Sequence, residues 1–264
     1  MDLRARARDW SEIQERMLVP LIEAVYERLD VGPATRLLGL GCGSGLALLM
    51  AASRGASITG VDTSADRLDL ARQRLLPDDR EDPARTGTRI VDGPVRAAAR
   101  PETGGYNVVT AFEPIGCRSG DAEGLGELLA EATPLTERGA AVVLAGWGPP
   151  ERCTTASVLR VATKLAEPLR SAWRPAHRDD LEEVAQRAGL RPDGSGRVAC
   201  PFGYADVDSA VRGLKSTGLF DAAISATDQV QVDKELTEAL HPYRRPDGTV
   251  WMPNIFRYLI ARTG

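Results

Sequence analysis

Three glycines at alternate positions, Gly41, Gly43 and Gly45, form the part of this chain whose spacing most directly suggests chemistry. Apolar runs at 37–40 and 46–52 flank them, so the pattern predicts a strand, a tight turn and a buried helix. Glycine lets a ligand approach the backbone because it has no Cβ, and the following helix presents free N–H groups at its positive end. We expect this turn to bind a ligand with a nucleotide or carboxylate part.

Two acidic residues follow later predicted strands, where they could complete the same site. Asp62 ends the run 57–61, about twenty residues beyond the turn, where a carboxylate can accept hydrogen bonds from ribose hydroxyls. Asp92-Gly93 ends the run 88–91, where a carboxylate can accept a hydrogen bond from an exocyclic amine such as that of adenine. We expect both carboxylates to face a common cavity beside the glycine turn.

Few side chains of this sequence suggest a catalytic acid or base. The chain has two histidines, His177 and His241, for which we predict a surface position and a helix-capping position. They remain candidates for a catalytic base, as do Tyr204 and Tyr243. The four cysteines are far apart and form no C-x-x-C pair, so the sequence predicts reduced thiols and no metal site.

Alternating strands and helices are expected to position these residues. Apolar runs predict strands at 35–40, 57–61, 88–91, 107–112, 140–147, 197–202 and 255–261. Between the first of these we expect helices at 44–53, after Thr63 and at 122–135, and Thr63 to Asp66 suggests a capping box. The alternation predicts an α/β fold: a doubly wound, mostly parallel, seven-stranded Rossmann-like sheet with helices on both faces.

The chain is expected to be a single domain over residues 1–264. Apolar spacing between Asp9 and Leu29 predicts helices that form an N-terminal cap over 1–34. The ligand-binding core is expected at 35–148, and 149–264 would form the substrate side. The helical pattern before the last strand is too long for a hairpin loop, so we expect a helical lid at about 203–249.

Composition excludes several classes of function. Hydrophobic residues make up 43% of the chain and charged residues 27%, as in ordinary globular proteins. The net charge of −4 argues against nucleic acid as the main partner. No apolar stretch is long enough to span a bilayer and no apolar segment follows the N-terminal arginines, so we expect a cytoplasmic protein without a signal peptide.

Five segments, in order, resemble the motifs of the class I S-adenosylmethionine-dependent methyltransferases, in particular the type 11 branch of small-molecule enzymes. The segments are LLGLGCGSG, GVDTS, RIVDGPV, YNVVTAFEPIG and RGAAVVLAGWG. They span roughly residues 35–148. The resemblance implies S-adenosyl-L-methionine as cofactor and transfer of its methyl group to a small organic acceptor.

Roles for individual residues follow from this resemblance. Gly41, Gly43 and Gly45 would line the methionine part of the cofactor, Asp62 would hold the ribose and Asp92 the adenine amine. The remaining cofactor residues would be Gly39, Thr63, Gly93, Phe112 and Trp10, with Gln14 beside Trp10. The acceptor pocket would draw on Phe112, Glu113, Trp147, Trp173, Phe202, Tyr204 and Trp251. The family usually has an acid where this chain has Gly39.

Two other functions remain open on the sequence alone. The same fold could bind the cofactor without methyl transfer, as a structural or regulatory element or as a catalyst of another reaction. An NAD-dependent oxidoreductase is disfavoured, because Leu46 stands where the third glycine of the G-x-G-x-x-G fingerprint would fall. We expect a small-molecule substrate, no membrane partner, and a possible homodimer through the N-terminal helices.

Overall fold

A seven-stranded sheet is the centre of the computed structural model, which describes residues 2–76, 87–99, 104–166 and 180–264. Its order is β3-β2-β1-β4-β5-β9-β6. The strands are β1 (Arg36–Leu40), β2 (Ser57–Asp62), β3 (Thr88–Asp92), β4 (Tyr106–Ile115), β5 (Thr136–Trp147), β6 (Arg191–Ala199) and β9 (Ile255–Arg262). Strands β1 to β5 pair in parallel, while β9 runs antiparallel between β5 and β6. The predicted fold class is confirmed.

The sheet positions the glycine turn at its centre. β1 pairs with β2 on one side and with β4 on the other, so the order of the strands reverses there. Ligands of open α/β sheets bind outside the carboxyl ends of the strands at such a reversal. The residues after β1, β2, β3 and β4 therefore meet at one edge of the sheet.

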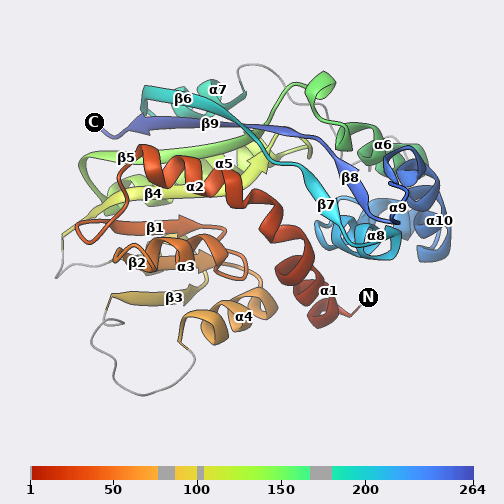
Figure 1. Ribbon diagram of the computed structural model, residues 1–264. Coiled ribbons are helices and arrows are strands. Elements are labelled where there is room, and N and C mark those ends of the chain that lie inside the picture. The colour runs from red at the N-terminus through yellow and green to blue at the C-terminus, as the bar shows by residue number, and fades with distance from the viewer. Residues whose placement is uncertain (1, 77–86, 100–103, 167–179) are drawn as a thin grey trace.

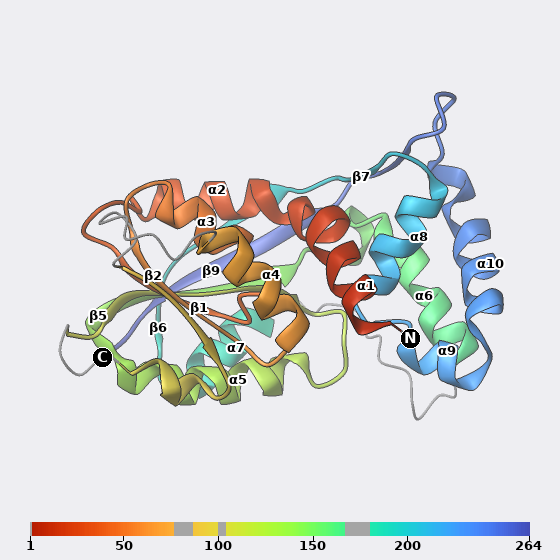
Figure 2. The same cartoon turned by 90° about the horizontal axis from the view of Figure 1, so that it is seen from below.

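Helices cover both faces of the sheet. The α-helices are α1 (Leu3–Asp9), α2 (Val19–Arg28), α3 (Leu46–Ala52), α4 (Ala65–Leu75), α5 (Asp121–Ala132), α6 (Thr155–Leu165), α7 (Asp180–Arg187), α8 (Val207–Ser216), α9 (Asp221–Ala226) and α10 (Gln229–Leu240). Helices α2, α3 and α4 lie on one face, and α5 and α7 lie on the other (Figure 2). Each face has its own apolar core, which explains the almost wholly apolar strands of the centre.

The N-terminal segment joins the sheet to the helical region. After α1 the chain passes through a π-helical turn, η1 (Trp10–Gln14), and a 3₁₀ turn, η2 (Glu15–Leu18), into α2. Pro20 stands at the start of α2, where its missing N–H has no helical partner to lose. Both views place α1 between the sheet and helix α8 (Figures 1 and 2).

A group of helices stands beyond the carboxyl ends of the parallel strands. Helices α8, α9 and α10 precede the last strand and pack with α6 (Figure 2). The predicted strand at 197–202 is wrong in its bounds, because β6 ends at Ala199 and a second sheet begins at Phe202. That sheet pairs β7 (Phe202–Tyr204) with β8 (Val250–Met252), and the sequence analysis missed it.

Short 3₁₀ turns complete the secondary structure. They are η4 (Val95–Ala98), η5 (Thr133–Leu135), η6 (Pro150–Arg152) and η8 (His241–Tyr243). Among the helices described, none is both long enough and apolar enough to cross a membrane.

The predicted capping box at Thr63 to Asp66 is wrong. Helix α4 begins at Ala65, with Ser64 as its N-cap and no side-chain hydrogen bond at the cap. Asp62 accepts a hydrogen bond from the backbone N–H of Ser64 instead, at 2.8 Å. Asp62 thus stabilises the turn between β2 and α4, because an aspartate side chain readily accepts a hydrogen bond from the backbone N–H two residues on.

Candidate functional site

The glycine turn allows the N-terminal helices to approach the carboxyl end of β1. Gly43 has φ +56°, which strains residues with a side chain. A Cβ there would lie 3.0 Å from Oε1 of Glu15 and 3.2 Å from Nε1 of Trp10. At Gly45, which also has a positive φ, a Cβ would meet Ala71 of α4 at 3.1 Å. Gly43 thus faces the N-terminal segment, whereas Gly45 packs against a helix.

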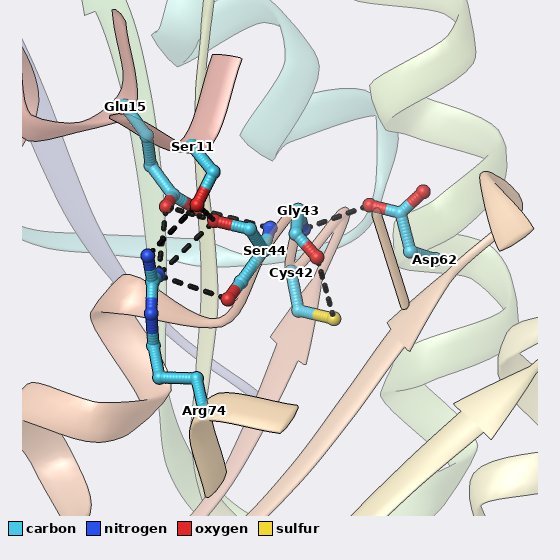
Figure 3. A network of polar contacts seen from close by, with 7 residues as sticks. All are labelled: Ser11, Glu15, Cys42, Gly43, Ser44, Asp62 and Arg74. Carbon is cyan, nitrogen blue, oxygen red and sulfur yellow. Dashed lines mark hydrogen bonds and ion pairs between the residues drawn. The ribbon is translucent and has the colours of Figure 1, made fainter. Parts of the chain in front are cut away.

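Asp62 ties the end of β2 to this turn (Figure 3). Its Oδ2 accepts a hydrogen bond from the N–H of Gly43 at 2.8 Å, while Oδ1 accepts the bond from Ser64. An ionised carboxylate has about four acceptor positions, so two remain for a ligand. The side chain is half-buried at the edge of a cavity. Its geometry therefore fits the predicted contact to a pair of hydroxyls.

A network of polar contacts holds the N-terminal segment on the glycine turn (Figure 3). Glu15 accepts hydrogen bonds from the N–H of Ser44 at 3.2 Å and from its hydroxyl, and pairs with Nη1 of Arg74 at 3.0 Å. Arg74 also donates to the carbonyl oxygen of Ser44 and to the hydroxyl of Ser11, both at 2.9 Å. Sequence analysis missed this network, whose one local signal is the i, i+4 spacing of Ser11 and Glu15.

Trp10 offers a donor that has no partner among the described residues. Its Nε1 is buried and makes no hydrogen bond with the described residues. The guanidinium of Arg67 lies 4.2 Å from the ring centre of the Trp10 side chain. A buried donor without an acceptor costs about 1–3 kcal/mol. Because this N–H adjoins Gly43, an anionic group bound over the turn would satisfy it. The site thus fits a ligand that carries a carboxylate.

A polar cavity of about 630 Å³ opens where β2 and β3 end. Asp62, Thr63 and Gly93, named from the sequence as cofactor residues, border it, and α1 and Thr217 form its outer wall. Asp92 does not border this cavity; it is exposed, although it stands in register with Asp62 on the neighbouring strand. The turn after β3 therefore faces the cavity through Gly93, not through the preceding carboxylate.

An apolar cavity of about 340 Å³ adjoins the polar one. Trp147, Phe202 and Phe256 line its inner end, with ring centres 4.6–5.9 Å apart. Trp10 and Gln14, named from the sequence as cofactor residues, also border it. Such a surface suits a small organic molecule with an apolar body.

A third, small cavity lies beside the glycine turn and shares lining residues with the other two. It has about 40 Å³ and is bordered by Gly39 and Phe112, both predicted cofactor residues. Gly41 and Glu113 border all three cavities. A ligand that extends over the turn from the polar cavity would therefore meet a second ligand in the apolar cavity beside these two residues.

The candidate bases named from the sequence do not gather at this junction. Tyr204 is buried and donates its hydroxyl proton to Oε1 of Gln14 at 3.0 Å, and burial raises its pKa far above the ordinary value. His241 and Tyr243 lie in η8 and border none of the three cavities. Trp251 likewise stands outside the cavities, under Arg245. His177 and Trp173 lie outside the described residues.

Comparison of the sequence with known proteins finds similarity to methyltransferases, which includes the segment that contains the glycine turn. Residues 38–110 match the methyltransferase domain family. Methyltransferase GfsG from Streptomyces halstedii is 38% identical over 73 residues, which are 27% of this chain and 25% of that protein. The chain thus matches about a quarter of the length of this curated relative.

Solved structures share the fold at low identity. Geranyl diphosphate C-methyltransferase from Streptomyces coelicolor A3(2), solved with S-adenosyl-L-homocysteine, has a TM-score of 0.51 at 16% identity, covering 92% of this chain and 78% of that one. The [4+2]-cyclase SpnF has a TM-score of 0.54 at 14% identity, covering 92% and 80%. The family match and this fold together confirm the resemblance to class I methyltransferases.

Proposed function

We propose that this chain acts as a class I methyltransferase and transfers a methyl group from S-adenosyl-L-methionine to a small organic acceptor. One observation carries the proposal: the polar cavity beside Asp62 and the apolar cavity meet at Gly41 and Glu113. A cofactor in the first cavity and an acceptor in the second would have their reacting ends at this junction. The net charge of −4 further supports a small molecule over a nucleic acid.

The predicted cofactor residues would each contact a different part of the cofactor. Asp62 would accept hydrogen bonds from the ribose hydroxyls through its two remaining acceptor positions. Gly41 and Gly43 would give the methionine part close access to the backbone, and the indole N–H of Trp10 would donate to its carboxylate. Thr63, Gly93, Gly39 and Phe112 would complete the site. For Asp92, contact with the adenine amine is supported by its register beside Asp62 alone.

When bound, the cofactor supplies a methyl group on a sulfonium centre, which makes the methyl carbon electrophilic. The chain's own residues would align the two ligands and exclude water. The aromatic end of the apolar cavity would orient the acceptor, and the helix α1 would cover the polar cavity. Such alignment can lower a barrier by about 7–11 kcal/mol in favourable cases.

Binding of S-adenosylhomocysteine, measured by calorimetry, tests the cofactor assignment. We expect Asp62→Ala to weaken binding by about 30-fold or more, because hydrogen bonds to a charged group contribute about 1.5–3 kcal/mol each. Asp193→Ala, on the far edge of the sheet, is the control and should bind as the wild type does.

A ligand pair tests the same contact without a mutation. Adenosine should bind more tightly than 2′,3′-dideoxyadenosine to the wild type, since the second ligand lacks both hydroxyls. Equal affinity for the two, or tighter binding of NADH than of S-adenosylhomocysteine, would contradict the proposal.

A second function deserves its own test: binding of the cofactor without methyl transfer. Gly39 stands where the family usually has an acid, and a Cβ there would already lie 3.0 Å from Leu48. SpnF shows that this fold also occurs in a cyclase. Tight binding of S-adenosylmethionine with no methylated product over a broad panel of acceptors would favour this alternative.

We also propose a cytoplasmic location. All four cysteines, Cys42, Cys117, Cys153 and Cys200, are free thiols, as is usual in a reducing compartment. A homodimer through the N-terminal helices stays a prediction, which sedimentation of the purified protein would test.

A further inference from the structure

Glu113 occupies the place where the three cavities meet. It lies near the carboxyl end of β4, and its Oε2 is 3.8 Å from where a Cβ of Gly41 would stand. No described residue donates a hydrogen bond to it or pairs with it, and its side chain is exposed. We propose that Glu113 accepts the proton of an apolar acceptor molecule that is methylated at an O–H or N–H group. This inference rests on the proposed methyl transfer.

Other titratable groups of the apolar cavity are unsuited to take a proton. Burial raises the pKa of the Cys117 thiol to about 12, so it stays protonated. Asp121 accepts hydrogen bonds through Oδ2 from the N–H groups of Gly116, Cys117 and Arg118, at 2.7–3.1 Å. This carboxylate shapes the loop after β4. Arg118 is a cation that donates to the carbonyl oxygen of Thr217.

The walls of the apolar cavity define the class of acceptor. Its inner end is aromatic, whereas Glu113 and Arg118 stand at the end that faces the polar cavity. A molecule with an apolar body would enter with its polar atom toward these two side chains, because burying that atom among the rings would cost its hydrogen bonds. A phenol, an enol or an aromatic amine has this shape.

The proposed step balances as follows. The acceptor oxygen or nitrogen uses a lone pair to form the bond to the methyl carbon, and the pair of the broken carbon–sulfur bond stays on sulfur. The proton of the acceptor atom passes to a carboxylate oxygen of Glu113. Since this side chain is exposed, water can take the proton afterwards.

Binding of matched probes tests the contact without relying on turnover. In protein saturated with S-adenosylhomocysteine, 2-naphthol should bind at least 5-fold more tightly than 2-methoxynaphthalene, which lacks the proton. Glu113→Leu should abolish this difference and leave binding of the methyl ether within 2-fold. Glu127→Gln, an exposed carboxylate of α5 outside the cavities, is the control. Equal binding of the two probes to the wild type, or no binding of either, would overturn the inference.

Turnover of any hydroxyl or amine acceptor adds a second readout. Glu113→Gln should lower kcat by about 100-fold or more, which is typical of a lost general base, with KM and the affinity for S-adenosylhomocysteine within 3-fold. A parallel loss of that affinity would show a cofactor-binding group instead and refute the proposal. If the wild type binds no S-adenosylhomocysteine, the proposed function itself fails. If the wild type binds it but the Glu113 variants behave as the wild type does, only this inference fails.

Discussion

Replacing Glu15 with glutamine removes the charge that holds the N-terminal segment on the glycine turn. Glu15 lies between the N–H of Ser44 and the guanidinium of Arg74, and its side chain is 9% exposed. Glutamine keeps the shape but turns an N–H₂ group or a neutral oxygen toward Arg74. The guanidinium, 23% exposed, then stands partly buried without its countercharge.

The size of the stability loss depends on the hydrogen bonds that Arg74 retains in the variant. Removing one partner of a fully buried ion pair costs about 3–5 kcal/mol. Arg74 retains hydrogen bonds to Ser44 and Ser11 and is partly reached by water, so we expect a loss of about 2 kcal/mol in the free energy of unfolding. For a chain of this length that corresponds to a Tm lower by about 4–8 °C.

Urea unfolding followed by circular dichroism measures this loss. Asp193→Asn is the matched control, because Asp193 pairs with Arg262 at 2.8 Å while the two side chains are 49% and 41% exposed. An exposed pair contributes about 0–1 kcal/mol. If Glu15→Gln costs no more than Asp193→Asn, the network acts like a surface pair and the reasoning from burial is refuted.

Two further predictions concern the glycine turn and the thiols. Gly43→Ala should destabilise the protein by at least 1 kcal/mol more than Gly139→Ala in urea unfolding, because both have positive φ but only Gly43 would press on Glu15 and Trp10; equal losses would contradict this. Burial raises the pKa of both Cys42 and Cys117 to about 12, so near pH 8 the thiolates are scarce. Iodoacetamide should therefore alkylate these cysteines about 100-fold more slowly in the native protein than in urea, and the rate in the native protein should rise steadily with pH; rapid native labelling would contradict this.

The arrangement of the core could be predicted from the sequence because its signals are local. Predicted runs of four to eight residues define strands β1 to β5 within a few residues of their observed bounds. The glycine spacing predicted a turn, since a backbone at positive φ favours glycine whatever surrounds it. Asp62 followed in the same way, because the end of a parallel strand beside such a turn lies at the ligand edge.

Local patterns also misled in two places. Thr63 to Asp66 has the spacing of a capping box, but helix α4 begins at Ala65 with Ser64 as its N-cap, and no side chain bonds the cap. Tyr204 was a candidate base from its residue type alone, whereas the fold buries it against Gln14. Residue spacing reveals neither outcome, because the start of a helix and the partner of a buried side chain depend on the surrounding structure.

Tertiary structure alone decided how the site is enclosed and which groups reach it. Glu15, Ser44 and Arg74 come from separate elements and meet because the N-terminal segment crosses the glycine turn. Glu113 reaches the junction of the cavities, and Asp92 does not border the polar one, although both lie at or near the carboxyl ends of strands of the same sheet. The sequence determines which residues end the strands, because periodicity is a property of neighbours along the chain. Which of those side chains share a cavity depends on how distant segments pack, and no single segment encodes that.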